Sequence, residues 1–130
     1  AEVKTWKTLT TKQMDDFTWN PFSDGVFRTP AFSEQDLEVM MLLCEEVVRR
    51  AAIFVAINIS TPILKTGSGR SPLHPVCITM DGSTFYKTKN LRSMVEQNLR
   101  DILGARGVYH ELIKVEEAPV IGAAVAGLTV

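Results

Sequence analysis

The chain has almost no net charge and no tract of one sign. Its 14 Lys and Arg residues nearly balance its 15 Asp and Glu residues, which leaves a formal net charge of −1. Domains that bind nucleic acid usually carry a basic patch or stripe. Because no such stretch is present, we expect no nucleic acid among the partners of this protein.

Long hydrophobic runs are also missing. The longest extends over residues 51–57, and Asn58 and Pro62 interrupt the pattern that follows. A membrane-spanning helix needs about 20 consecutive apolar residues, and no segment has the pattern of a secretory signal peptide. The sequence therefore predicts no membrane partner.

Cysteine and histidine are scarce, with two of each in 130 residues. Cys44 and Cys77 lie in apolar segments without a second ligand at zinc spacing. We predict two buried, reduced thiols in a cytoplasmic protein in preference to a disulfide. His74 lies in a proline-flanked loop and His110 begins a strand, and neither has a companion typical of catalysis. We expect surface or structural roles for both, and we predict no catalytic residue and no metal site.

The composition, 45% hydrophobic and 22% charged, is ordinary for a globular protein, and the length suits one domain or part of a larger one. Residues 1–32 are irregular and rich in large apolar side chains. We predict an extended arm, with one short strand at most. It should cover this domain or a part of the parent protein outside this sequence, because such side chains are costly to leave in water. The anchors are Trp6, Leu9, Met14, Phe17, Trp19, Phe22, Phe27 and Phe32.

The sequence pattern of residues 33–60 predicts one long helix. Ser33 is a typical N-cap residue, and acidic residues follow it in the first turn. Apolar residues then recur at steps of three and four up to about Ile59. The run 51–57 is apolar on nearly all sides, so we expect it to be covered on more than one face.

The composition of residues 61–75 predicts a flexible loop. The stretch Gly67-Ser68-Gly69-Arg70 has part of the composition of a phosphate-binding loop. It lacks the Lys-Ser/Thr ending, and no strand precedes it. We therefore interpret it as a connection between elements.

The sequence pattern of residues 76–130 predicts four elements in the order strand, helix, strand, helix. The strands are 76–80 and 109–115. The helices are about 89–103, with Gly104 as the residue just past its end, and about 118–128. A helix between two strands predicts a parallel pair with a right-handed crossover. Two strands alone make a poor sheet, which favours a partial domain. Small residues at 122, 123, 126 and 127 predict a close neighbour for the last helix, because glycine is otherwise costly there.

The turn after the first strand is the most informative segment. Asp81-Gly82-Ser83-Thr84 separates an apolar strand from a helix, and α/β proteins use this arrangement to hold nucleotides. Glycine lets the backbone approach a ligand, and the hydroxyls of Ser83 and Thr84 can donate hydrogen bonds to it. Asp-Gly-Ser is also common in ordinary turns, which stays the alternative.

Three segments together resemble the C-terminal part of the large domain of hexokinases. Residues 44–52 (CEEVVRRAA) are similar to the C-E-x-[IV]-x-x-R-A-A stretch of the family's long helix. Residues 79–87 (TMDGSTFYK) resemble its D-G-[ST]-x-Y adenosine motif. Residues 115–125 (VEEAPVIGAAV) are similar to its E-D-G-S-G-x-G-A-A-[VL] segment. Residues 6–16 add a weaker similarity to the stretch before the family's first helices.

The resemblance implies the α/β architecture of sugar kinases, actin and heat-shock ATPases, with two ribonuclease-H-like halves around a cleft. This chain would be much of the C-terminal half. It also implies a cytoplasmic, glycolytic kinase that uses ATP with Mg²⁺ to phosphorylate a hexose such as glucose at the 6-hydroxyl. Carried over by position, the nucleotide contacts are Asp81, Gly82 and Ser83, with Thr84 as an additional candidate.

The sequence departs from the family in two places. The turn is one residue longer, because Ser83-Thr84-Phe85 separates Gly82 from Tyr86, so the hydroxyl that would face the phosphates stays open. Glu117-Ala118-Pro119-Val120 stands where the family has an acid followed by glycine and serine, and only Gly122-Ala123-Ala124 carries over, as helix packing.

The family's first phosphate loop, its sugar-binding segment and its catalytic aspartate have no counterpart here. We therefore expect this chain to be inactive alone, to require the N-terminal part of the same protein, and to self-associate through bare apolar surface. Two other functions remain open: a non-catalytic nucleotide-binding or regulatory module, and part of a chaperone-type ATPase of the same superfold.

Overall fold

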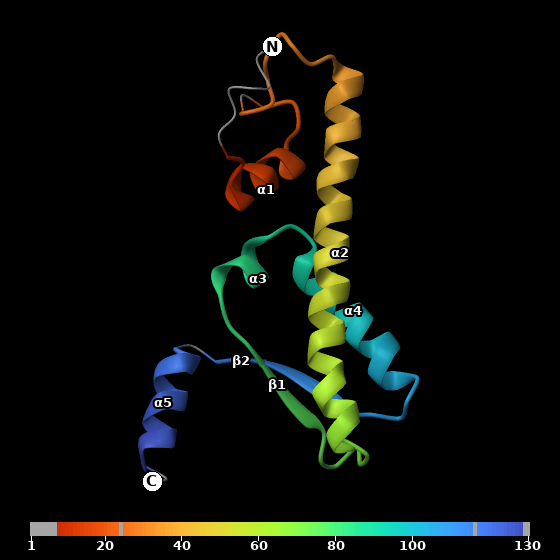
Figure 1. Cartoon of the computed structure of the whole chain (residues 1–130), viewed down its shortest axis with the longest axis vertical. Helices are drawn as coiled ribbons and strands as arrows, with labels where there is room; N and C mark the ends of the chain where they lie inside the picture. The colour runs from red at the N-terminus through yellow and green to blue at the C-terminus, as the bar shows by residue number, and fades with distance from the viewer. Residues whose placement is uncertain (1–7, 24, 116, 129–130) are drawn as a thin grey trace.

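The computed structural model describes residues 8–23, 25–115 and 117–128, and its elements are arranged around one long helix (Figure 1). In chain order they are α1 (Thr11–Trp19), α2 (Glu34–Thr66), β1 (Val76–Met80), α3 (Ser83–Lys87), α4 (Leu91–Gly104), β2 (His110–Lys114) and α5 (Ala118–Leu128). The mixture of helices with a parallel strand pair is the α/β arrangement that the sequence predicts. Within these ranges no helix is long and apolar enough to cross a bilayer.

Helix α2 begins at the predicted position and runs past its predicted end. The Ser33 hydroxyl accepts a hydrogen bond from the Asp36 N–H, and the Asp36 carboxylate accepts one from the Ser33 N–H, at 3.2 and 2.8 Å. Pro62 lies inside the helix, so the prediction of a loop from residue 61 is wrong. Proline removes one backbone hydrogen bond, and burial of Ile63 against the core keeps the last turns packed. The helix stops at Gly67, whose φ of 69° is left-handed.

The main core lies between α2 and α4. Small and branched side chains of α2 pack against a stripe of apolar side chains on α4. Each fully buried Leu or Val contributes about 1.5–3 kcal/mol to the stability of the fold. The run 51–57 is covered only in part, because Phe54 and Ile57 are exposed, so the expected cover on more than one face is not found within the described residues. The buried residues are Val48, Ala52, Ala56 and Ile63 in α2 and Leu91, Val95, Leu99 and Leu103 in α4.

The two strands pair in parallel, as predicted. Val76 lies opposite His110, and Met80 lies opposite Lys114. Ile78, at the centre of β1, is buried in the main core. Because the strands are parallel, their carboxyl ends meet at one edge, and the segments that follow Met80 and Lys114 start from that edge.

The connection between α2 and β1, predicted as a flexible loop, is tied to the rest of the fold by hydrogen bonds. The Tyr109 N–H donates to the Gly69 carbonyl at 2.8 Å, and the Arg70 guanidinium donates to the Arg106 carbonyl at 2.6 Å. Gly69 has a φ of 74°, and a Cβ added there would lie 2.6 Å from the Tyr109 oxygen. Only glycine satisfies both constraints.

The segment predicted as an irregular arm contains α1. Thr10 and Gln13 form a capping box, in which the Thr10 hydroxyl accepts from the Gln13 N–H at 3.2 Å and the Gln13 side chain accepts from the Thr10 N–H at 3.0 Å. Phe17 packs on Phe27 with ring centroids 4.5 Å apart, and Leu37 of α2 completes a second core. Trp6, another predicted anchor, lies outside the described residues.

The region after β1 differs in detail from the prediction. A short helix, α3, begins at Ser83, and α4 begins at Leu91 after Asn90, which has a φ of 61°. Gly104 belongs to the last turn of α4, so its assignment as the residue past the helix end is wrong. Gly107 takes the left-handed conformation instead, with a φ of 64°.

Helix α5 stands beside the strands and apart from α2 (Figure 1). Its large apolar side chains Val120, Ile121, Val125 and Leu128 are exposed. A Cβ added at Gly122 or at the following glycine of the helix would meet no heavy atom within 4 Å. At these two glycines, the predicted close neighbour is therefore not found among the described residues.

Ser60 provides a test of the α2–α4 core. It is 2% exposed, and its hydroxyl has no hydrogen-bond partner in the described part of the chain. We predict that Ser60→Ala raises the free energy of unfolding by about 1 kcal/mol, because it removes a buried unsatisfied group and favours the helix. Urea denaturation measures the change. Ser93→Ala is the control, since its exposed hydroxyl donates to the Asn90 carbonyl. A less stable Ser60→Ala variant would contradict this account of the core.

Gly69 and Gly107 form a matched pair. Both have a left-handed φ, of 74° and 64°, but only Gly69 has atoms closer than 3 Å to an added Cβ. We predict that Gly69→Ala destabilises the protein by about 1–3 kcal/mol more than Gly107→Ala does, because the clash adds to a shared backbone cost. Thermal denaturation of both variants measures the difference. Equal losses of stability in the two variants would show that the connection between α2 and β1 adjusts to the added Cβ without a further loss of stability.

Candidate functional site

The bend at residues 81–84 follows the carboxyl end of β1 and is open to solvent. All four of its residues are exposed. The Gly82 N–H donates to the Asp81 carboxylate at 2.7 Å, so the Asp81 side chain is occupied in shaping its own turn. Gly82 has a φ of 108°, and a Cβ added there would have no heavy atom within 4 Å. The bend therefore presents bare backbone to the space outside the strand ends.

Tyr86 fixes the bend to the strands. Its hydroxyl donates to the Met80 carbonyl at 3.0 Å, and its ring packs edge-on against Phe85 at 5.0 Å between centroids. The Arg92 guanidinium carbon and the Lys114 Nζ lie 5.7 and 5.4 Å from the same ring centroid. Through these cation–π contacts, the end of β2 and the start of α4 both meet the Tyr86 ring. The bend is thus held from several elements.

A pocket of about 410 Å³ lies between the bend and α1. We call it the charged pocket. One wall is formed by α1 and the other by the bend, by α3 and by the residue that follows it. The lining residues are Thr11, Lys12, Asp15, Asp16, Ser83, Thr84, Lys87 and Thr88.

The two lysines of the charged pocket differ in their surroundings. Lys12 donates to Asp16 at 2.6 Å, and this hydrogen bond, with the charge of Asp16, raises the pKa of Lys12. Lys87 forms no ion pair with any described residue. Its ammonium group is therefore free to meet an anion beside the hydroxyls of Ser83 and Thr84.

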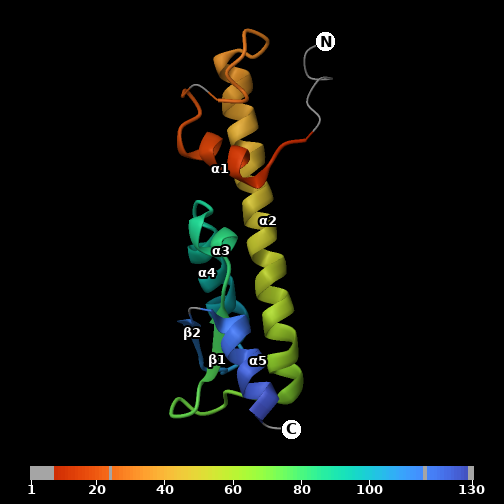
Figure 2. The ribbon, with the colours of Figure 1, turned by 90° about the vertical axis from the view of Figure 1, so that its left-hand side faces the viewer.

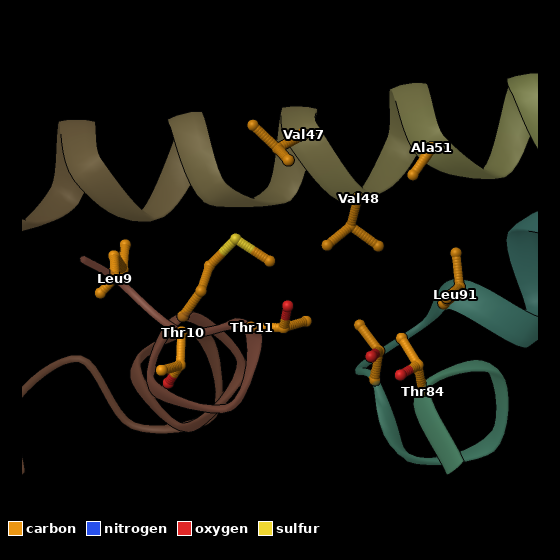
Figure 3. Close-up of a pocket in the computed structure, with 10 residues that line it drawn as sticks. Leu9, Thr10, Thr11, Val47, Val48, Ala51, Thr84 and Leu91 are labelled. Carbon is orange, nitrogen blue, oxygen red and sulfur yellow. The ribbon is translucent and has the colours of Figure 1, made fainter. Parts of the chain in front are cut away.

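A second pocket, of about 260 Å³, adjoins the charged pocket (Figure 3). We call it the apolar pocket. Figure 3 shows Val48 and Ala51 projecting from α2, with Leu9 on one side and Leu91 on the other. No charged side chain lines it, and it shares three threonines with the charged pocket. The lining residues are Leu9, Thr10, Thr11, Met14, Val47, Val48, Ala51, Thr84, Thr88 and Leu91.

Two of the four predicted nucleotide contacts lie at the charged pocket. Ser83 and Thr84 line the charged pocket, whereas Asp81 and Gly82 shape the bend without lining it. Lys87 was not among the predicted contacts, although it directly follows Tyr86 of the D-G-[ST]-x-Y segment. Lys12 and Thr11 were missed because they lie about 70 positions away and reach the bend only through the fold.

The cysteines and histidines lie outside both pockets. Both cysteines are free, as predicted, but Cys77 is exposed, because alternation along β1 turns it away from the core. Burial and the neighbouring Glu45 raise the pKa of Cys44. Burial and then the charge of Arg100 lower the pKa of His110. No group of three or more potential metal ligands occurs among the described residues.

Comparison with known proteins supplies the family. No curated protein and no solved structure matches the chain. A family model described as Hexokinase matches residues 3–129, which is nearly the whole sequence. The chain belongs to the hexokinase family.

Proposed function

We propose that this chain supplies the adenosine- and phosphate-binding wall of an ATP-dependent hexokinase, which phosphorylates glucose or a related hexose at the 6-hydroxyl. The observation that carries the proposal is the open bend at the carboxyl ends of two parallel strands, where α/β proteins bind nucleotides. Ser83 and Thr84 would donate to phosphate oxygens beside Lys87, and Gly82 would let the backbone approach. Asp81 would hold the bend through its bond to the Gly82 N–H.

The chain is proposed to be a partial domain of the ribonuclease-H-like superfold. A sheet of two strands rarely suffices for stability, and large apolar side chains of α2 and α5 remain exposed. These surfaces would pack against the N-terminal part of the same protein, which would bring the catalytic base and the hexose site. The same surfaces would support self-association of the chain alone.

Magnesium would enter this site with the nucleotide. Phosphoryl transfer depends on positioning and on neutralising the phosphate charge, and Mg²⁺ binds through substrate phosphates and a few carboxylates. The described residues offer no ligand cluster for it. The described residues therefore fit a magnesium ion that would be held mainly by the nucleotide phosphates, beside the hydroxyls of Ser83 and Thr84 and the ammonium group of Lys87.

The decisive experiment uses the protein produced from its complete reading frame. We expect ATP binding by isothermal titration and ADP formation that depends on both Mg²⁺ and a hexose, whereas residues 1–130 alone should form none. Nucleotide binding without turnover would favour a non-catalytic module, and turnover without a hexose would favour a chaperone-type ATPase. Absence of adenine nucleotide binding would reject the proposal.

Gly82 tests the role of the backbone. We predict that Gly82→Val raises the Kd for ATP about tenfold or more, because a branched side chain blocks the approach to the bend. Gly67→Val is the control: its φ of 69° is also left-handed, its Cβ position is open, and it lies at the end of α2. Isothermal titration of both variants separates backbone strain from loss of the site. Equal affinities would remove Gly82 from the site.

Ser83 and Thr84 test which hydroxyl faces the phosphates. We predict that Ser83→Ala raises the Kd for ATP about fivefold, the equivalent of one hydrogen bond of about 1 kcal/mol. Thr84→Val should have the smaller effect. Ser68→Ala is the control, because this exposed hydroxyl lies in the loop after α2 and contacts Thr66. A larger loss at Thr84 would move the phosphate contact by one residue.

A further inference from the structure

Lys89, in the link between α3 and α4, contacts two other helices. Its N–H donates to the Asp15 carboxylate at 2.7 Å, and its Nζ donates to the Thr18 carbonyl at 2.6 Å. The same Nζ lies 3.6 Å from the Glu45 carboxylate of α2 and 5.6 Å from the centroid of the Trp19 ring. We call this set the Lys89 clamp. It joins positions more than 70 residues apart in sequence.

The clamp is partly sheltered from water. The Lys89 side chain is 25% exposed and that of Glu45 is 41% exposed, against 83% and 61% for Lys12 and Asp16 in their pair. Thr18, whose carbonyl accepts from Lys89, is buried. Hydrogen bonds to a charged group are about twice as strong as neutral ones, and shelter from solvent reduces screening. The clamp is therefore a directional fastening of α1, whereas exposed pairs contribute little.

The clamp also touches the charged pocket through the backbone. Asp15 lines that pocket from α1, and Thr88, the neighbour of Lys89, lines it from the opposite wall. Figures 1 and 2 show α1 and α3 placed one after the other along α2. Within the described residues, α1 is otherwise attached through the apolar side chains of Met14 and Phe17, and such contacts have little directional preference. Lys89 therefore provides the directional contact between the two walls.

We propose that Lys89 is a positioning residue: through Asp15 and Thr18 it fixes α1 as the second wall of the charged pocket and thereby sets the affinity for the nucleotide without touching it. The effect on nucleotide rests on the proposed function, whereas the fastening of α1 does not. Loss of the clamp releases α1, widens the charged pocket and removes one wall of the adjoining apolar pocket.

The experiment follows Trp19 and nucleotide binding in the same protein, produced from its complete reading frame. The chain has two tryptophans, so any Trp outside this sequence and Trp6 are replaced by Phe to leave Trp19 as the reporter. Lys89→Met keeps the length of the side chain and removes its charge. The Trp19 side chain is already 64% exposed, so its emission reports the loss of the Lys89 ammonium from beside the ring. Release of α1 is read from proteolysis, and we expect cleavage by a protease within residues 20–32 to become faster.

Nucleotide affinity is measured by titration with ATP. We expect Lys89→Met to raise the Kd about two- to thirtyfold, the range for residues that act through a coupled element. The KM for ATP should rise with kcat at saturating ATP unchanged. Asp15→Ala should act in the same direction, and Asp15→Asn should recover most of the loss, because its amide oxygen can still accept from the Lys89 N–H.

Two controls separate positioning from general damage. Lys65→Met removes an exposed lysine at the far end of α2 and should change neither readout. Ser83→Ala should weaken ATP binding without moving the Trp19 emission. Because members of one network act non-additively, Lys89→Met combined with Asp15→Ala should cost less than the sum of the single changes.

Each outcome decides the proposal. Unchanged cleavage in Lys89→Met would show that Lys89 does not hold α1. Faster cleavage with an unchanged Kd for ATP would show that α1 does not set the pocket, and either result overturns the positioning role. If the unaltered protein binds no ATP, the proposed function fails, and the rate of cleavage still decides whether Lys89 fastens α1.

Discussion

The contact between α2 and α4 is the interaction on which the rest of the structure depends. Ala52 and Ala56 give α2 a smooth face, and Val95, Leu99 and Leu103 of α4 are buried against it with no measurable exposure. Helix α4 is also the link between β1 and β2, so its docking fixes the strand pair on α2. Without this contact the parallel pair would have no support, because two strands alone are marginal in water.

The position of the candidate site follows from that arrangement. Parallel strands end at one edge, and the bend at residues 81–84 emerges there with Tyr86 holding it to Met80. A pocket requires a second wall, which α1 supplies from a distant part of the sequence. The site therefore combines a wall fixed by the main core with a wall held by the second core and by the polar contacts of Lys89.

The exposed apolar side chains fit the family assignment. Phe54 and Ile57 of α2 and several residues of α5 face solvent, although soluble monomers rarely leave wide apolar patches bare. A hexokinase has to enclose a nucleotide and a sugar between two walls to position the phosphoryl group. Under the proposed function, these side chains would pack against the other part of the protein that completes the cleft.

The sequence by itself determined the elements whose signals are local. The Ser33 cap and the apolar steps of three and four gave the start and the face of α2, and turn residues separated β1 and β2 from their helices. The D-G-S turn was found because glycine and hydroxyl chemistry are readable from adjacent residues. Helix α1 was missed because its apolar residues have no sustained period, and Pro62 was misjudged because packing outweighs one lost hydrogen bond.

Only the tertiary structure decided what faces the bend. Lys12 and Asp15 come to Ser83 through the packing of α1 beside α2, and Lys89 bonds Asp15 through a contact that no spacing in the sequence predicts. The tertiary structure also decided that the two glycines of α5 have no close neighbour among the described residues, although the small residues suggested one. The physical reason is that a hydrophobic period specifies which face is buried, but the partner of that face depends on long-range contacts whose energies no local pattern contains.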